Sequence, residues 1–275
     1  MRKPALKRIV FIIAVIILLV FAYSFIEPFW IQVKRIDIMH PDIPEEFNGF
    51  TIAFMADIHH GPYFSTKRLE RLVIKTNALK PDMVLLGGDY VHRDDVRHVY
   101  SCFKALGKLT ANFGTYAVIG NHDYRMGEEL TIQEMDNNRI QLLRNTGVWI
   151  NKGEEQFFLG GVDDLMEGRP DMQATVKDAD ERNFVLVVSH NPDVAEGQPL
   201  DRVDWILAGH THGGQVTLFG LWAPIVSSSF GQRYRTGLVQ KGNTSIYVTN
   251  GIGTITPPVR FFARPQIIYI TLNNK

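Results

Sequence analysis

The chain has 275 residues, of which 45% are hydrophobic and 21% are charged, and its 29 basic and 29 acidic side chains give a formal net charge of zero. These values are ordinary for a globular protein and exclude a disordered, collagen-like or coiled-coil chain. The single cysteine excludes an intrachain disulfide and any metal site built from several cysteines.

The N-terminal segment, residues 1–26, differs in charge from the rest of the chain. It holds Arg2, Lys3, Lys7 and Arg8 and no acid, so 25 of the 29 bases and all 29 acids lie in the remainder, which carries about −4. An uninterrupted apolar run follows over residues 9–26. As a helix it would be about 27 Å long, close to the hydrocarbon thickness of about 30 Å. We therefore predict a membrane anchor over 1–26.

A cleaved signal peptide is the alternative for this segment, because a small-x-small site occurs at residues 22–24. For an uncleaved anchor, the positive-inside rule predicts a single-pass protein of the cell membrane with its N-terminus in the cytoplasm and the rest of the chain outside. Lys34 and Arg35 on the far side of the apolar run oppose this orientation. The side on which the main domain lies is therefore left open.

The remaining chain is predicted to be an α/β domain over 50–275, preceded by a linker and a first strand over 27–49. Five short apolar runs end abruptly in polar residues, as buried strands do. These runs are 50–56, 83–86, 116–119, 184–188 and 205–208. Apolar residues at helical spacing predict helices over 65–79 and 96–109, and the tail is rich in predicted strands, at 245–248 and 267–272.

The polar residues after the five runs are of metal-binding types. In open α/β sheets, ligands bind outside the carboxyl ends of the strands. Carboxylate, amide and imidazole groups suit Mn, Fe or Zn, and Asp-x-His and His-x-His spacing turns both side chains to one side of an extended segment. The candidates are Asp57, His59, Asp89, Asn121, His122, His190, His210 and His212.

In their order along the chain, these motifs resemble those of the calcineurin-like metallophosphoesterase family. The matching motifs are Asp57-Ile58-His59, Gly88-Asp89, Gly120-Asn121-His122-Asp123, His190 and Gly209-His210-Thr211-His212. The blocks at 189–193 and 209–215 look most similar to its membrane-linked bacterial branch, which includes YkuE/YaeI-type phosphodiesterases and enzymes that split UDP-2,3-diacylglucosamine. The resemblance implies a four-layer α-β-β-α sandwich of two mixed sheets.

The resemblance also implies two divalent metal ions, of which Mn, Fe or Zn are expected. One ion would be held by Asp57, His59, Asp89 and His212, and the other by Asp89, Asn121, His190 and His210. A hydroxide that bridges the ions would attack phosphorus. His122 would protonate the leaving oxygen, and Asp123 would orient the His122 ring.

Three further residues are candidates for substrate contact. His60 follows a proposed ligand directly, Asp164 follows what resembles another strand end at Gly160-Gly161, and Arg260 carries a guanidinium, which suits phosphate. For Arg260 a solvated loop position is an equally good interpretation, and for Asp164 a plain turn is the simpler one.

We expect a membrane-anchored phosphoesterase that hydrolyses phosphodiester or pyrophosphate bonds, with a lipid-linked substrate such as UDP-2,3-diacylglucosamine of the lipid A pathway. A general extracytoplasmic phosphodiesterase or phosphatase is the alternative. A non-catalytic scaffold is disfavoured because all seven ligand positions are filled. No nucleic-acid partner is expected, since the domain is slightly acidic and lacks a basic cluster interleaved with aromatics.

Overall fold

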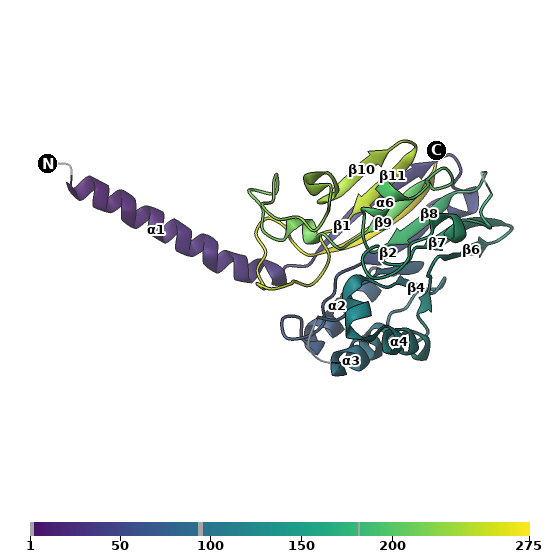
Figure 1. Ribbon diagram of the computed structural model, residues 1–275, viewed down its shortest axis with the longest axis horizontal. Coiled ribbons are helices and arrows are strands. Elements are labelled where there is room, and N and C mark those ends of the chain that lie inside the picture. Colours follow the sequence, from purple (N-terminus) through teal and green to yellow (C-terminus); the bar gives the residue numbers. More distant parts are fainter. Residues whose placement is uncertain (1–2, 93–95, 181) are drawn as a thin grey trace.

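Two six-stranded β-sheets form the centre of the protein (Figure 1). The computed structural model describes residues 3–92, 96–180 and 182–275, so Arg2 of the N-terminal basic group lies outside the described residues. The first sheet contains, in spatial order, β1 (Gln32–His40), β12 (Gln266–Asn274), β2 (Thr51–Met55), β3 (Met83–Gly87), β4 (Thr115–Val118) and β5 (Gln141–Leu142). The second contains β10 (Gly237–Lys241), β11 (Thr244–Val248), β9 (Trp205–Ala208), β8 (Val185–Ser189), β7 (Glu155–Gly161) and β6 (Thr146–Lys152).

Both sheets are mixed, as predicted. Strands β2, β3, β4 and β5 run parallel, while β12 is antiparallel to β2 and parallel to β1. In the second sheet β7, β8, β9 and β11 run parallel, and β6 and β10 add antiparallel edges. The parallel strands therefore place their carboxyl ends along one edge of each sheet, where ligand sites form in such folds.

The four-layer arrangement is confirmed by where the side chains are buried. A core between the two sheets contains Phe54, Leu85, Leu159, Leu186 and Leu207. A second core lies between the first sheet and the helices α2 (Thr66–Asn77), α3 (Arg97–Leu106) and α4 (Asn121–Asn137), and a third lies under the short helices α5 (Met172–Thr175) and α6 (Val194–Gly197). Strands β3 and β8 are buried along their whole length because both faces of each sheet are covered.

The sequence did not predict β5, β6, β10 or α4. Strand β5 has two residues, and β6 and β10 are edge strands in which most positions are half-buried or exposed, so they show no continuous apolar run. Helix α4 begins within the motif at Asn121 and is interrupted at Gly127, where φ is 122°. Its weak apolar face gives little helical periodicity in the sequence.

The N-terminal helix α1 (Lys3–Ile26) projects away from the sheets (Figure 1). Its large apolar side chains are exposed, from 37% at Val15 to 69% at Phe11. Among the described residues, α1 is the one helix that is both long enough and apolar enough to cross a membrane, by length and composition. At its base the buried Glu27 carboxylate accepts hydrogen bonds from the backbone amides of Phe262 and Ala263, at 2.8 and 2.7 Å, and so fixes the helix to the domain.

Candidate metal centre

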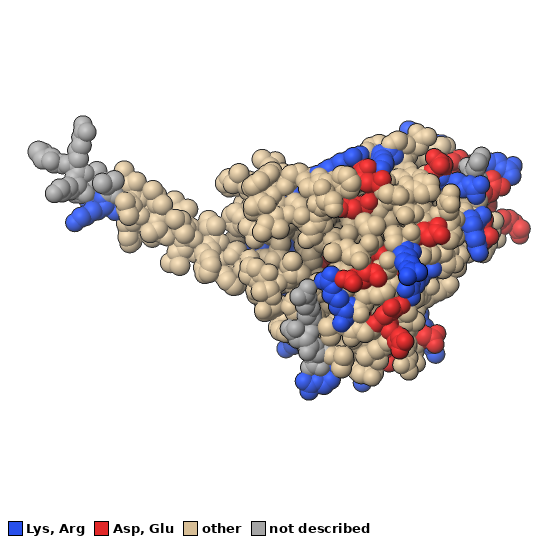
Figure 2. All heavy atoms as spheres, viewed as in Figure 1, with Lys and Arg blue, Asp and Glu red and all other residues tan. Residues whose placement is uncertain are grey.

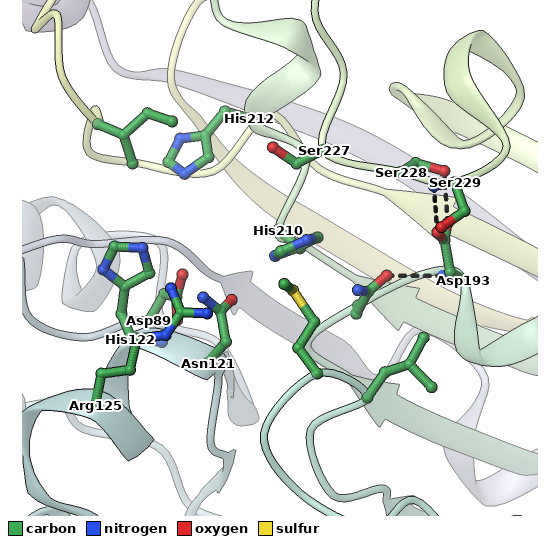
Figure 3. A pocket seen from close by; sticks show the side chains of 14 residues that line it. Asp89, Asn121, His122, Arg125, Asp193, His210, His212, Ser227, Ser228 and Ser229 are labelled. Atoms are coloured by element: carbon green, nitrogen blue, oxygen red, sulfur yellow. Dashed lines mark hydrogen bonds between the residues drawn. The ribbon is translucent and has the colours of Figure 1, made fainter.

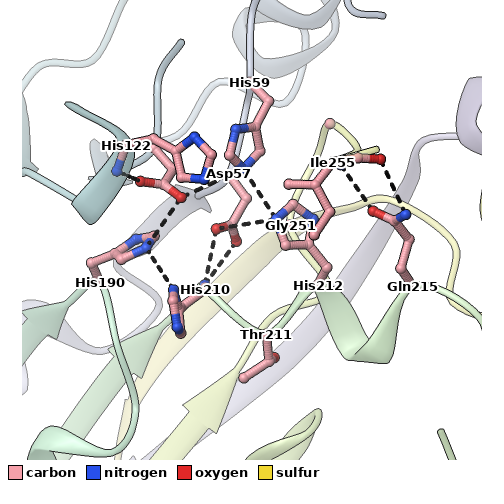
Figure 4. Close-up of polar contacts among 12 residues, drawn as sticks. Asp57, His59, His122, His190, His210, Thr211, His212, Gln215, Gly251 and Ile255 are labelled. Atoms are coloured by element: carbon pink, nitrogen blue, oxygen red, sulfur yellow. Dashed lines mark hydrogen bonds and ion pairs between the residues drawn. The ribbon is translucent and has the colours of Figure 1, made fainter. Parts of the chain in front are cut away.

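The loops after β2, β3, β4, β8 and β9 meet at the edge shared by the two sheets, and their polar side chains point toward one another (Figure 4). Within the first sheet, the Asp57 amide donates to the Gly88 carbonyl at 2.9 Å and the His59 amide donates to the Asp89 carbonyl at 3.0 Å. The ladder of β2 and β3 thus continues past the strand ends. Main-chain pairing therefore holds these two motifs side by side.

One group of candidate ligand atoms comes from the loops after β2 and β9. The carboxylate of Asp57 and the rings of His59 and His212 offer ligand atoms that all lie within 4.8 Å of one another. The two Nε2 atoms of His59 and His212 are 3.0 Å apart, and His212 Nε2 lies 3.8 Å from Asp57 Oδ1. Asp57 and His59, two positions apart, thus converge on one centre, although their backbone is left-handed at both positions and not extended as the spacing argument assumed.

A second group combines Asp89 with His190 and His210. His190 Nε2 lies 3.3 Å from Asp89 Oδ2, 3.1 Å from His210 Nδ1 and 3.2 Å from Asn121 Oδ1. The same oxygen, Asp89 Oδ2, lies 3.5 Å from His59 Nε2 of the first group. One carboxylate oxygen therefore lies between the two groups.

Five of the candidate ligand residues have left-handed backbone conformations, which non-glycine residues rarely adopt. They are Asp57 (φ 53°), His59 (φ 46°), Asp89 (φ 56°), His210 (φ 69°) and His212 (φ 53°). Each such residue costs on the order of 1–3 kcal/mol and persists where surrounding contacts impose it. Concentration of this strain in one cluster is typical of a functional site.

Glycines allow the chain to close around the Asp57 carboxylate. A Cβ atom added at Gly209 or Gly251 would lie 2.6 Å from Asp57 Oδ2, and Gly251 also has φ of +67°. The same carboxylate accepts from the His210 backbone amide at 2.9 and 3.0 Å. Only glycine leaves room for this carboxylate, which explains the Gly-His pairing in the last motif.

Burial sets the protonation of most of the cluster. It raises the pKa of Asp57 to about 7 and lowers the pKa values of His59 and His210 to about 3, so these rings are neutral and their lone pairs are available. Burial also opposes charge on Asp89 and His190. Their mutual attraction outweighs it, holding the pKa of Asp89 well below and that of His190 well above the usual range.

The donor set fits divalent metal ions. The Nε2 atoms of His59 and His212 lie 3.0 Å apart, so both would be able to bind one ion. Buried carboxylates without a neutralising cation are costly, and Asp57, Asp89 and Asp123 lie in one small region with complete or near-complete burial. Neutral imidazoles and carboxylates together suit Mn, Fe or Zn.

His122 and Asp123, at the start of α4, differ in position. His122 lines the open cavity and its ring centroid lies 4.7 Å from that of His59. Asp123 is fully buried, and its carboxylate accepts from the backbone amides of Asp89, Tyr90 and Gly120 at 2.8–2.9 Å. These hydrogen bonds hold the β3 loop against the start of α4. The role of Asp123 in orienting the His122 ring stays a prediction.

A cavity of about 610 Å³ opens over the cluster (Figure 3). His122 and Arg125 line its α4 side, and Ser227, Ser228 and Ser229 line the opposite side. Sequence reasoning missed Arg125 and the serines. Arg125 lies one helical turn after Asn121 and so shares its face, but this signal depends on α4, which the sequence did not predict. The serines lie in an irregular loop with no motif to mark them.

Asp193, in the block at 189–193, also lines this cavity and binds the serine loop on its wall. Asp193 accepts from the Ser228 hydroxyl at 2.5 Å and from the Ser229 amide at 2.6 Å. These two hydrogen bonds hold the serine loop over the candidate metal ligands. Asp193 therefore shapes the wall of the cavity.

Two of the three predicted substrate contacts are buried away from the cavity. His60 is 1% exposed, and its ring nitrogens contact the Phe64 carbonyl at 2.7 Å and the Ser101 hydroxyl at 2.8 Å. Asp164 is fully buried, and its Oδ1 accepts from the amides of Met166 and Glu167 at 2.9 and 2.8 Å. Neither side chain lines the cavity, so both predictions are wrong. His60 contacts a carbonyl and a hydroxyl group, and Asp164 Oδ1 holds the turn that follows it, while Asp164 Oδ2 is buried without a hydrogen-bond partner.

Arg260 is the third incorrect prediction, and both the solvated and the substrate-binding interpretations fail. Its side chain is fully buried. Its guanidinium donates to the carbonyls of Gly253 at 2.5 and 3.1 Å, Ala263 at 2.7 Å, Asn250 at 2.8 Å and His212 at 3.3 Å. Burial lowers its pKa to about 10, which still leaves it charged at neutral pH. Arg260 thus supports the loop of His212 from behind.

Comparisons with known proteins agree with this geometry. The sequence model of the calcineurin-like phosphoesterase family matches residues 50–214. The uncharacterized metallophosphoesterase YkuE of Bacillus subtilis is 32% identical over 253 residues, which cover 91% of this chain and 88% of that protein. The phosphodiesterase YaeI of Escherichia coli is 32% identical over 254 residues, covering 90% of each. Among solved structures, the NAD nucleotidase of Haemophilus influenzae has a TM-score of 0.51 at 15% identity, covering 74% of this chain and 45% of that chain, and shares the fold.

Proposed function

Because the chain belongs to the calcineurin-like phosphoesterase family and is a metal-dependent phosphoester hydrolase, we propose that it cleaves phosphodiester or pyrophosphate bonds at a dinuclear metal centre. The position of Asp89 carries this proposal. Its Oδ2 lies 3.5 Å from a ring nitrogen of one ligand group and 3.3 Å from a ring nitrogen of the other, as a bridging ligand requires.

The proposed ligands divide into two sets that share this carboxylate. Asp57, His59, Asp89 and His212 would hold one ion, and Asp89, Asn121, His190 and His210 would hold the other. When bound, such a pair of ions supplies an activated water and stabilises negative charge on phosphoryl oxygens. The neutral His59 and His210 rings can bind without first losing a proton.

Residues on α4 would handle the substrate. His122, at the wall of the cavity, would donate a proton to the leaving oxygen. The Arg125 guanidinium, paired with Glu167 at 2.5 and 2.8 Å, would contact a phosphoryl oxygen and takes the place expected for Arg260. Asp123 would keep the two metal-binding loops in register.

We further propose that residues 1–26 anchor the protein in the cell membrane, with 27–49 joining this anchor to the domain at 50–275. A lipid-linked substrate suits a site held beside the bilayer. UDP-2,3-diacylglucosamine remains a candidate only if the domain faces the cytoplasm, where such nucleotide-linked lipids are handled. A reporter fused to the C-terminus would find the side. A domain outside the cytoplasm would exclude this substrate and favour a general extracytoplasmic phosphodiesterase.

The full chain in detergent micelles, supplied with Mn²⁺ and bis-p-nitrophenyl phosphate, tests the proposed chemistry. We expect Asp89→Ala to abolish turnover and lower bound metal, whereas His122→Ala should lower kcat by roughly 10²- to 10⁴-fold and keep its metal. Asp136→Ala, which removes an exposed carboxylate of α4, is the control and should behave as wild type. No turnover with Mn²⁺, Fe²⁺ or Zn²⁺ would instead support a scaffold.

A further inference from the structure

A loop beside the base of α1 exposes an unusual number of large apolar side chains. Residues 213–232 contain no Asp, Glu, Lys or Arg. We call residues 216–225 the apolar loop. In Figure 2 the surface next to the base of α1 is mostly uncharged on this face, while acidic and basic side chains lie over the middle and far end of the domain. The most exposed apolar side chains of the loop are Leu218 (58%), Phe219 (66%), Leu221 (82%), Trp222 (51%) and Ile225 (77%).

The apolar loop is a formed hairpin. The Leu218 amide donates to the Trp222 carbonyl at 2.7 Å, and the Arg235 guanidinium donates to the Gly220 carbonyl at 2.7 Å. The Phe219 ring lies 5.5 Å from the ring of Phe262. Its exposed apolar residues are therefore held outward by fixed contacts. Exposed apolar area of this kind marks a binding surface for another apolar phase.

The loop and α1 share an apolar groove of about 450 Å³. Val216, Pro257 and Phe261 line it from the domain, and Ile16 and Phe25 line it from the helix. Ile16 lies in the middle of the apolar run at 9–26. If α1 spans a bilayer, the domain surface that faces Ile16 lies within the hydrocarbon layer. This continuity with α1 identifies a lipid bilayer as the occupant of the surface.

A smaller cavity of about 290 Å³ lies between this groove and the metal cluster. It shares Val216 and Pro257 with the groove, and it shares His212, Ser227 and Ile255 with the cavity over the metal ligands. Ile225 and Pro224 also line it. The three cavities thus form a series that leads from α1 to the candidate metal ligands, and their lining becomes more polar toward these ligands.

We propose that this series is a binding site for an amphipathic phosphoester, with the hydrocarbon chain along the apolar loop and the phosphate at the metal cluster. The proposal rests on the proposed hydrolase function and deepens it by naming the class of substrate. The substrate enters sideways from the bilayer, so its chain never crosses water. In the reaction, water adds to phosphorus, one P–O ester bond breaks, and the leaving oxygen takes a proton.

Two chromogenic esters that differ only in chain length provide the first test. Hydrolysis of ethyl or hexadecyl p-nitrophenyl phosphate releases p-nitrophenol and leaves the alkyl phosphate. We expect the full chain in micelles to show a kcat/KM at least tenfold higher for the hexadecyl ester. The double variant Val216→Gln/Ile225→Gln should lose at least fivefold on this ester and stay within twofold of wild type on the ethyl ester.

The matched control is Ile74→Gln/Leu238→Gln, which alters two exposed apolar residues, 69% and 60% exposed, on α2 and β10. It should leave both rates unchanged. Equal kcat/KM for the two esters, from an active enzyme, would overturn the chain-binding site alone. Hydrolysis of neither ester would overturn the proposed function and the site with it.

A second measurement does not depend on activity. Cys102 is fully buried, so a label can be attached at Leu221→Cys and, as control, at Leu238→Cys. With the full chain in phosphatidylcholine vesicles, spin labels on the acyl chains should quench a fluorophore at position 221 and spare one at 238. If the spin labels quench neither fluorophore while iodide in the water quenches both, the proposed contact between the apolar loop and the bilayer is overturned.

Discussion

Replacement of Arg260 by Leu should destabilise the domain without a selective effect on substrate binding. The guanidinium satisfies four main-chain carbonyls by five hydrogen bonds, and all of them are buried with it. Each carbonyl left without a donor costs about 1–3 kcal/mol. Removal of the buried charge recovers part of this cost, because burial disfavours that charge and lowers its pKa. A net loss of about 3–5 kcal/mol follows, near the upper limit for one substitution.

Thermal and denaturant unfolding of the full chain in detergent would measure this loss, with hydrolysis followed on the folded fraction. A domain of this size loses about 2–4 °C in Tm per kcal/mol, so a fall of roughly 6–20 °C is expected. Arg182→Leu, at an arginine whose side chain is 88% exposed, is the control and should leave Tm unchanged. Wild-type stability together with a raised KM in Arg260→Leu would refute the reasoning and restore Arg260 as a substrate contact.

Two further predictions concern the metal cluster. Gly251→Ala should lower metal affinity at least tenfold, because the new Cβ would lie 2.6 Å from Asp57 Oδ2. Gly242 has a similar positive φ but nothing within 4 Å of an added Cβ, so Gly242→Ala is the control for backbone strain. A loss of metal affinity in Gly251→Ala alone would show that displacement of Asp57 is the cause. Removal of metal by EDTA should lower Tm, and added Mn²⁺ should restore it in a concentration-dependent way. Ions that bind only the folded state stabilise that state, and here they would also relieve repulsion among Asp57, Asp89 and Asp123. An unchanged Tm after EDTA treatment of a metal-loaded sample would contradict this prediction.

The central strands could be predicted from the sequence because both of their faces are buried. Strand β9 matches the predicted run at 205–208, and β2, β3, β4 and β8 each match within one or two residues at their ends. Strands β6 and β10 could not be predicted, because an edge strand is only partly covered and needs few apolar residues. Their place in the sheet depends on pairing with β7 and β11.

Some residues of the candidate site could likewise be predicted from the sequence, and others could not. Residues identified by their type and short spacing are among the candidate ligands: Asp57 and His59 lie in one ligand group, and His212 and His210 lie one in each of the two groups. Residues judged only by side-chain chemistry were assigned wrongly. His60, Asp164 and Arg260 carry suitable groups, but their direction depends on which main-chain atoms surround them, and these come from distant parts of the chain.

The sequence by itself determined the order of the metal-binding motifs, the buried strands that precede them and the apolar segment at 9–26, because each is a local pattern of residue type and spacing. Only the tertiary structure decided that Asp89 lies between the two ligand groups, that Arg125 lines the cavity while Arg260 is buried, and that Val216 of the apolar loop shares a groove with α1. These are contacts between segments up to about 200 residues apart, and they follow from how the two sheets pack face to face, which no local pattern encodes.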